Sequence, residues 1–431
     1  MVTLGLDIGT TTISAVAVEE GRVLAAETLP NDAALPGEDW ERKQDPRRIL
    51  LLARQAVERL LARFPQTERI GVTGQQHGIV YLDRDGQPVS PLYTWQDQRG
   101  RRQTPEGDTY VARLRTLTGC NVPAGYGMVT HFYNVNNGLV PPEAAVLCTI
   151  HDLAAMTLAG LTAPAMDASD AASFGLFDLK RGRFDTEAVQ AAMMDPAILP
   201  RMAAAPCLGT GATGLPVYRA IGDNQASFLG ATGGQTRCML LNMGTGSQFS
   251  VHVPEYLACE GLETRPFPTG GYLLVGAALC GGRSWALLEK FFRETAELVT
   301  GQPAGNCYAA MERALEQAPE DMVPPTVTPL FQGTRADPAL RGTITGLSPD
   351  NFTPGGFLKG MAQGMAEELR EMYGQYLSAG GTPLPLYGSG NGLRLNRQLR
   401  RVMEQAFGLP LHMAVNQEEA ACGAALFAAG W

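Results

Sequence analysis

Two similar stretches decide the fold of this chain: residues 6–12, LDIGTTT, and residues 241–247, LNMGTGS. Residues with a preference for β-strands precede each stretch, and an apolar run that is typical of a strand follows it. Each stretch therefore predicts a β-hairpin whose turn is built from Gly and Thr. Because the hairpin is written twice, we predict two related domains.

The Gly-Thr turns also suggest a ligand. Glycine lets the backbone approach a bulky anion, and N–H groups next to hydroxyls can hold phosphate oxygens. A nucleotide between two such turns would be held from both sides. Gly-Thr is also ordinary turn chemistry, and a single copy would favour that interpretation. The repetition favours a phosphate site.

Composition limits the class of protein. The chain has 431 residues, of which 45% are hydrophobic, which is enough for two or three domains. Its formal net charge of −9 offers no basic surface to nucleic acid or to an anionic membrane, so we expect a small-molecule role. The start of the chain has no basic leader, and no run approaches the ~18 apolar residues that span a bilayer. These features predict a cytoplasmic protein.

The cysteines give no metal or disulfide pattern. The 8 cysteines are scattered without C-x-x-C spacing, which favours free thiols in a reducing cytoplasm and implies no zinc site.

Helical and strand periodicities alternate along the chain, which predicts the α/β class. Residues 47–64 predict a helix that leads into a strand at 69–72, as in a βαβ crossover. We predict further helices at 132–137, 151–159, 283–298, 357–377 and 396–407, and strands at 145–148 and 217–221. In the helix at 283–298 we expect one apolar face, formed by Trp285, Leu288, Phe291 and Phe292. The Gly/Thr/Pro-rich residues 206–216 place the domain boundary, so we expect domains at 1–216 and 217–431.

Asp223 is a candidate functional residue. It follows the predicted strand at 217–221 and opens a predicted helix, at the mouth of the sheet where open α/β folds bind ligands. The alternative is a helix N-cap, which stabilises a helix by ~1 kcal/mol. A capping carboxylate can also face a cleft, so the two interpretations are compatible.

Two polar clusters in the first half are typical of a site for a hydroxyl-rich ligand. Gln76 and His77 lie between two glycines at a strand end, and amides and imidazoles both donate and accept hydrogen bonds. Downstream, Trp95 offers an aromatic platform beside Asp97 and Arg99, a typical sugar-binding mixture. The alternatives are a buried loop anchor for Trp95 and a surface ion pair between Asp97 and Arg99. We interpret His131, His151 and His412 as structural.

No G-x-x-x-x-G-K-[ST] loop occurs, so a nucleotide would be held without a P-loop lysine. The Gly-x-Gly-x-Gly loop at 388–392 resembles a nucleotide cradle only weakly. Asp7, at the end of the first strand, is the natural residue to hold Mg²⁺ through water. The alternative for Asp7 is an ordinary turn aspartate.

These motifs, taken together and in order, resemble one family. The ordered set is Asp7-Ile8-Gly9-Thr10-Thr11, Gln75-Gln76-His77-Gly78, Trp95-Gln96-Asp97-Gln98-Arg99, Gly222-Asp223-Asn224-Gln225, Met243-Gly244-Thr245-Gly246 and Gly388-Ser389-Gly390. It resembles the FGGY carbohydrate kinases, and the resemblance covers nearly the whole chain. It implies an α/β, actin-like (ribonuclease H-like) duplicated ATPase fold with two domains around a central cleft. Ile150-His151-Asp152 and Ala171-Ala172-Ser173-Phe174-Gly175 are most similar to the sedoheptulokinase branch.

The resemblance also implies roles for particular residues. Asp223 would be the catalytic base and, with Asp7, would lie by Mg²⁺. The sugar contacts would be Gln76, His77, Trp95, Asp97 and Asp223. The ATP contacts would be Thr10, Thr11, Thr12, Gly244 and Thr245 at the phosphates, and Gly282, Gly388, Ser389 and Asn391 near the adenosine.

The sequence therefore predicts an ATP-dependent kinase that phosphorylates a primary hydroxyl of a ketose, with sedoheptulose as the best candidate. Its partners would be a small-molecule sugar and ATP, with a homodimer left open. Xylulokinase or ribulokinase activity is the alternative among enzymes. A non-catalytic actin-like ATPase and a sugar-sensing pseudokinase are the alternatives outside catalysis.

Overall fold

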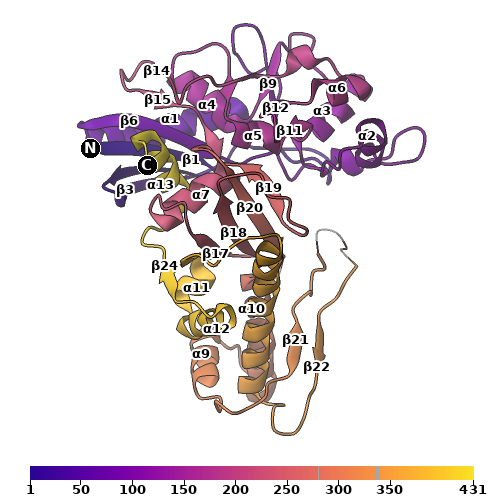
Figure 1. Ribbon diagram of the computed structural model, residues 1–431, viewed down its shortest axis with the longest axis vertical. Coiled ribbons are helices and arrows are strands. Elements are labelled where there is room, and N and C mark those ends of the chain that lie inside the picture. The colour runs from indigo at the N-terminus through magenta and orange to yellow at the C-terminus, as the bar shows by residue number, and fades with distance from the viewer. Residues whose placement is uncertain (280, 335–336, 338) are drawn as a thin grey trace. The chain divides into compact units, whose positions relative to one another are not determined.

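The computed structural model describes residues 1–279, 281–334, 337 and 339–431 (Figure 1). The chain forms two compact units. Unit 1 comprises Met1–Gln235, Arg265–Tyr272 and Val415–Trp431, and unit 2 comprises Thr236–Thr264 and Leu273–Ala414.

Unit 1 is built on a mixed sheet. Strands β1 (Val2–Ile8), β2 (Thr12–Glu19) and β3 (Arg22–Pro30) form an antiparallel meander, and β6 (Thr67–Gly74) lies parallel to β1. The strand order is β14-β15-β6-β1-β2-β3, with β16 also paired to β6. The first hairpin and the crossover to a parallel strand are therefore confirmed.

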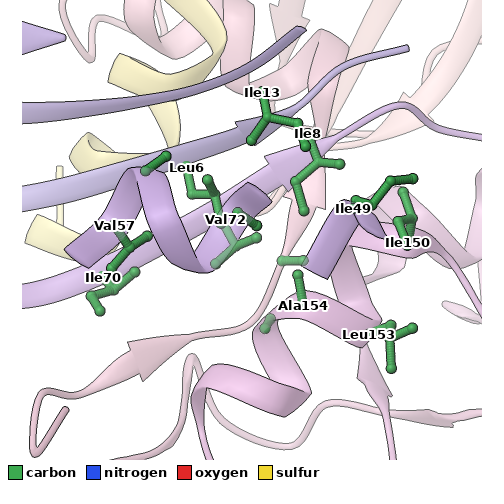
Figure 2. Close-up of a cluster of buried hydrophobic side chains, with 14 of the residues drawn as sticks. Leu6, Ile8, Ile13, Ile49, Val57, Ile70, Val72, Ile150, Leu153 and Ala154 are labelled. Carbon is green, nitrogen blue, oxygen red and sulfur yellow. The ribbon is translucent and has the colours of Figure 1, made fainter. Parts of the chain in front are cut away.

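Helix α1 (Pro46–Arg63) makes this crossover. Asp45 caps it by accepting a hydrogen bond from the backbone N of Arg47, and proline fits its first turn because the N–H there needs no helical partner. Its apolar face packs into a core with the sheet, where Figure 2 shows Val57 gathered with Leu6 and Val72. Burial of this face, rather than helix propensity alone, stabilises the crossover.

The C-terminal helix α13 (Glu419–Ala429) belongs to unit 1. A Cβ on Gly5 would lie 1.8 Å from the carbonyl oxygen of Ala421, and one on Gly71 would lie 1.9 Å from that of Ala424. Glycine at these two strand positions therefore lets the helix lie directly on β1 and β6.

Residues 217–235 also group with unit 1, although we expected the domain boundary between 216 and 217. Strand β16 (Ile221–Gly222) pairs with β6, and helix α7 (Asp223–Thr232) packs on α13. A Cβ on Gly230 would lie 1.8 Å from the carbonyl oxygen of Glu419, so the two helices are in backbone contact. The expected domain boundary at 216 stays a prediction, whereas packing groups residues 217–235 with unit 1.

Further elements complete unit 1. They are β4 (Ala34–Leu35), β5 (Lys43–Gln44), β7 (Val80–Leu82), β8 (Leu92–Tyr93), α2 (Tyr110–Thr118), α3 (Gly127–Asn136), β9 (Val146–Cys148), α4 (Ile150–Leu158), β10 (Ala165–Met166), α5 (Ala168–Ser173), β11 (Phe177–Asp178), β12 (Arg183–Phe184), α6 (Thr186–Ala191), β13 (Arg201–Met202), β14 (Cys207–Gly209) and β15 (Val217–Tyr218), with short 3-10 turns at Arg99–Arg101 and Pro196–Ile198.

Unit 2 repeats the central topology of unit 1. Strands β17 (Met239–Met243) and β18 (Ser247–Val253) form the second hairpin, and β23 (Leu386–Ser389) lies parallel to β17 as β6 does to β1. The order is β19-β20-β18-β17-β23-β24. The duplication predicted from the repeated hairpin is confirmed.

The remaining elements of the second half are β19 (Glu263–Pro266), β20 (Tyr272–Ala278), α8 (Gly282–Thr300), α9 (Tyr308–Glu316), β21 (Thr326–Thr328), β22 (Thr343–Thr345), α10 (Pro354–Ser378), α11 (Asn391–Leu395), α12 (Arg397–Phe407) and β24 (Leu411–Met413).

Most predicted elements are present, with two differences. The strand expected at 217–221 is interrupted, because β15 and β16 pair with β6 at separate places. On α8 the expected apolar face is incomplete: Trp285 and Leu288 are buried, but Phe291 is 56% exposed.

Seven cysteines, at 120, 148, 207, 238, 259, 307 and 422, are in no disulfide within the described part of the chain, and Cys280 lies outside the described residues. Among the described helices, none combines the length and apolar character needed to cross a membrane.

Candidate active site

Two carboxylates meet at one edge of the sheet in unit 1. Asp7 on β1 and Ile221 on β16 are both register partners of Thr73 on β6, so Asp223, two residues after Ile221, follows the same edge. Two causes raise the pKa of Asp7 to about 7: burial is the larger, and the negative charge of Asp223 is the next. The predicted metal residues are therefore close enough for their charges to interact.

Asp223 does not cap its helix. The N-cap of α7 is Gly222, no side chain caps this helix in the described part of the chain, and Asp223 lies in its first turn. Its Oδ1 accepts a hydrogen bond from Asn224 Nδ2 at 3.1 Å. The N-cap alternative is therefore wrong, and the partly exposed carboxylate is available to a ligand.

Gln76 lies under the start of α7. Its side chain is 2% exposed, and Nε2 donates to the carbonyl oxygen of Ser169 at 3.0 Å. A Cβ on Gly222 would lie 1.9 Å from this Nε2, so only glycine leaves room for the amide. Among the described residues, neither Gln76 Oε1 nor the nearby Gln225 Oε1 has a hydrogen-bond donor. Buried acceptors normally have a partner, and a ligand hydroxyl would supply one.

His77 is held in an unusual backbone conformation. Its φ of 73° lies in the left-handed region that non-glycine residues rarely adopt. Three contacts fix it: the backbone N donates to Ser173 Oγ at 3.2 Å, Nδ1 lies 2.8 Å from the carbonyl oxygen of Ser173, and the ring stacks on Tyr126 at 4.0 Å. Because a carbonyl only accepts, Nδ1 carries a proton. A strained backbone conformation that several contacts hold in place is found most often at functional sites.

A buried ion pair lies behind Gln76. His151 Nε2 is 2.9 Å from Asp170 Oδ1, and both side chains are fully buried. Burial alone would lower the pKa of His151, but the charge and hydrogen bond of Asp170, with the charges of Asp152 and Asp223, together outweigh burial and raise that pKa to about 9. Asp170 Oδ1 is also 3.5 Å from Gln76 Nε2.

His151, Asp152 and Asp170 bring ligand-type atoms within 4.8 Å of one another. The interpretation of His151 as structural stays a prediction, and the structure adds these two carboxylates beside it. The sequence signal that could have linked it to Gln76 is weak, because Asp170 lies in a separate segment.

Asp97 makes its hydrogen bonds within the protein. It is fully buried, with Oδ1 accepting from Arg99 Nε at 2.8 Å and from the backbone N of Arg99 at 3.0 Å, while Oδ2 accepts from Arg99 Nη2 and from the backbone N of Arg42, both at 3.1 Å. These four bonds use the acceptor sites of the carboxylate. The predicted sugar contact is therefore not supported by this geometry. The sugar contact stays a prediction, whereas the alternative of a surface ion pair is wrong, because the pair is buried and anchors the loop that carries Trp95.

Trp95 is an exposed platform rather than a buried anchor. Its side chain is 45% exposed, and Nε1 donates to Thr10 Oγ1 at 3.0 Å. Its backbone is fixed by close packing, since a Cβ on Gly125 would lie 1.8 Å from the Trp95 carbonyl oxygen. The structure thus brings a predicted sugar residue and a predicted phosphate residue into direct contact.

In unit 2 the predicted nucleotide residues gather at the second turn. Gly282 N donates to the carbonyl oxygen of Gly244 at 2.9 Å, and Arg283 N donates to that of Thr245 at 3.1 Å. Gly390 packs on the same turn, because its missing Cβ would lie 2.5 Å from the Met243 carbonyl oxygen.

The strand end beside this turn adds Gly388, Ser389 and Asn391, the last at the start of α11. Ser389 Oγ is buried and accepts from Asn242 Nδ2 at 2.7 Å, so this hydroxyl serves the strand pair.

Comparison with known proteins identifies the architecture. Residues 2–230 match the N-terminal domain of the FGGY family of carbohydrate kinases, and residues 239–430 match its C-terminal domain. The chain belongs to the FGGY family of carbohydrate kinases. It is an ATP-dependent sugar kinase with the actin-like, ribonuclease H-like duplicated fold.

Individual relatives of this FGGY kinase span its whole length. The sedoheptulokinases of Mus musculus and Homo sapiens are each 28% identical, with 99% of this chain and 96% of each relative covered. A xylulose kinase of Streptomyces coelicolor is 27% identical over 99% of this chain and 87% of the relative. The crystal structure of xylulose kinase from Rhodospirillum rubrum has a TM-score of 0.87 at 24% identity, covering 100% of this chain and 89% of that one, and shows the shared fold.

Proposed function

We propose that this kinase transfers the γ-phosphoryl group of ATP to the terminal primary hydroxyl of a ketose, and that sedoheptulose is its preferred substrate. The observation that carries the catalytic part is the pair formed by Asp7 and Asp223 at one edge of the sheet. The choice of sugar is supported by the two full-length sedoheptulokinase relatives. A xylulose preference is the second candidate, because a xylulose kinase is nearly as similar.

Asp223 is the proposed general base. Its carboxylate is partly exposed and is not occupied by helix capping. It accepts the proton of the sugar hydroxyl while that oxygen attacks the γ-phosphorus, and the ADP oxygen leaves in line. Phosphoryl transfer needs little covalent chemistry from the protein, so positioning supplies most of the acceleration.

Asp7 and Asp223 also fit a magnesium ion. Burial and the charge of Asp223 raise the pKa of Asp7, and a divalent cation would stabilise the charged form of Asp7; Mg²⁺ prefers carboxylate and water oxygens. Bound there, Mg²⁺ would neutralise charge on the phosphates.

Gln76, His77 and Trp95 are the proposed sugar contacts. Gln76 Oε1 lacks a donor among the described residues, and a sugar hydroxyl would satisfy it. Leaving such a group unmatched costs about 1–3 kcal/mol, which is the basis of discrimination between sugars. Asp97 is proposed instead as an anchor for the Trp95 loop.

The phosphates and the adenosine are assigned to the two turns and to the strand end of unit 2. The proposed phosphate residues are Thr11, Thr12, Gly244 and Thr245, and the proposed adenosine residues are Gly282, Gly388 and Asn391, with Ser389 acting through its backbone.

A coupled ADP-release assay with sedoheptulose, D-xylulose, D-ribulose and glycerol tests the proposal. We expect kcat/KM for sedoheptulose to exceed that for the two pentuloses at least about tenfold, and glycerol to be poor because it leaves most polar groups unmatched. Phosphorus NMR of the product checks that the terminal hydroxyl carries the phosphate. If D-xylulose matches or exceeds sedoheptulose, the sugar assignment is wrong while the kinase assignment stands.

A further inference from the structure

A closed circuit of hydrogen bonds lies under the first Gly-Thr turn. Thr10 Oγ1 bonds Gln75 Oε1 at 3.2 Å, Gln75 Nε2 donates to Gln44 Oε1 at 2.9 Å, and Gln44 Nε2 donates to the carbonyl oxygen of Thr10 at 2.8 Å. Both glutamines are buried. The circuit therefore holds the side chain and the backbone of Thr10 together.

The direction of every bond in this circuit follows from the carbonyl oxygen of Thr10, which can only accept. Gln44 Nε2 therefore donates to it, Gln44 Oε1 accepts from Gln75 Nε2, and Gln75 Oε1 accepts the single hydroxyl proton of Thr10. Trp95 joins the circuit at the same hydroxyl, because its indole N–H donates to Thr10 Oγ1 at 3.0 Å.

The single hydroxyl proton of Thr10 argues against the phosphate contact that the family resemblance implies for this residue. Its one proton is committed to Gln75, so its hydroxyl has none to donate to a phosphate oxygen. The adjacent Thr11 and Thr12 are exposed, and their hydroxyls belong to the same turn.

We propose that Thr10, Gln75 and Gln44 are positioning residues that tie the phosphate turn to the Trp95 platform, and that Thr11 and Thr12 supply the hydroxyls for the phosphate. This inference rests on the proposed binding of sugar at Trp95 and of ATP at the turn. It makes Trp95 a determinant of ATP affinity, which a platform serving the sugar alone is not.

The first test is Trp95→Phe, which keeps an aromatic face and removes the N–H. We expect KM for ATP to rise about two- to tenfold, the value of one hydrogen bond, in addition to any change in KM for sugar. Thr10→Val should raise KM for ATP similarly, and Thr10→Ser, which keeps the hydroxyl, should restore it. Trp431→Phe is the matched control, because this terminal tryptophan is also about half exposed.

The second test is Gln75→Glu with Gln75→Met. The carboxylate can still accept from Thr10 but cannot donate to Gln44, and a flipped Gln44 amide would place its oxygen against the Thr10 carbonyl. Both variants should therefore raise KM for ATP, the neutral Gln75→Met showing that charge is not the cause. Gln96→Glu adds the same charge at an exposed position beside Trp95 and should leave KM for ATP unchanged.

All assays use the ketose that the wild-type enzyme turns over fastest, so a wrong sugar assignment does not affect them. Circular dichroism and thermal melting show which variants are folded. The inference is overturned if folded Trp95→Phe and Thr10→Val enzymes both keep the wild-type KM for ATP, or if Thr10→Ser behaves like Thr10→Val.

Discussion

Replacing Asp223 with Asn separates its proposed role as a base from any role in the fold. The change keeps the size of the side chain and an oxygen that can accept from Asn224 Nδ2. No cap is lost, because Gly222 is the N-cap of α7. Losing a negative charge in the first turn costs about 0.3–1 kcal/mol of helix-dipole interaction, and losing the repulsion of Asp7 offsets part of this. The free energy of unfolding should therefore change by less than about 1 kcal/mol.

The chemical step should respond much more strongly. Removing a general base typically lowers kcat by about 10²–10⁴-fold, while ATP affinity should change little. Since the charge of Asp223 raises the pKa of Asp7, Asp223→Asn should also lower that pKa. Steady-state kinetics, urea unfolding and carboxyl NMR titration measure the three effects. A variant that is destabilised by several kcal/mol, yet whose folded fraction turns over normally, would refute the assignment of the base.

The remaining predictions concern the residues around this pair. Gly222→Ala should displace the Gln76 amide and raise KM for sugar at least several-fold with ATP binding retained, which isothermal titration can check. Asp97→Ala should destabilise the protein by about 3–5 kcal/mol, because it leaves Arg99 charged and buried without its partner, and an unchanged melting temperature would contradict this. The native state holds the His151 proton more tightly than the unfolded chain, so its contribution to stability is complete below about pH 6.5 and is lost as the pH rises towards 9. Unfolding curves across this range should show that loss, on the order of 3 kcal/mol, and His151→Asn should flatten it.

Local patterns predicted the local structure well. The two hairpins, the α1 crossover and most helices followed from turn glycines and apolar periodicity, which act within a few residues. The glycine contacts that place α13 on β1 and β6 join the two ends of the chain, and no local pattern records such a contact. No local pattern records the packing of α7 on α13 either, and this packing is why residues 217–235 belong to unit 1.

The sequence indicated which residues lie together at the candidate site, but not the surroundings of each side chain. Asp7, Asp223 and Gln76 gather at one sheet edge because each lies in or just after the last residues of a strand in the same parallel set. The sequence could not show that the Asp97 carboxylate is occupied by Arg99. Two opposite charges that are two residues apart form the same sequence pattern whether they lie on the surface or in the core. The raised pKa of His151 could not be predicted either, because it depends on Asp170, which lies in another segment.

The duplicated fold gives the two halves the same scaffold and different chemistry. Strand β6 ends in Gly74 and continues into Gln75, Gln76 and His77, amide and imidazole groups that suit sugar hydroxyls. Its counterpart β23 ends in Ser389 and continues through Gly390 into Asn391, where α11 begins. A glycine with positive φ followed by a helix start exposes backbone N–H groups rather than side chains. In the proposed roles, the residues that follow β6 thus select the sugar, and the residues that follow β23 hold the adenosine.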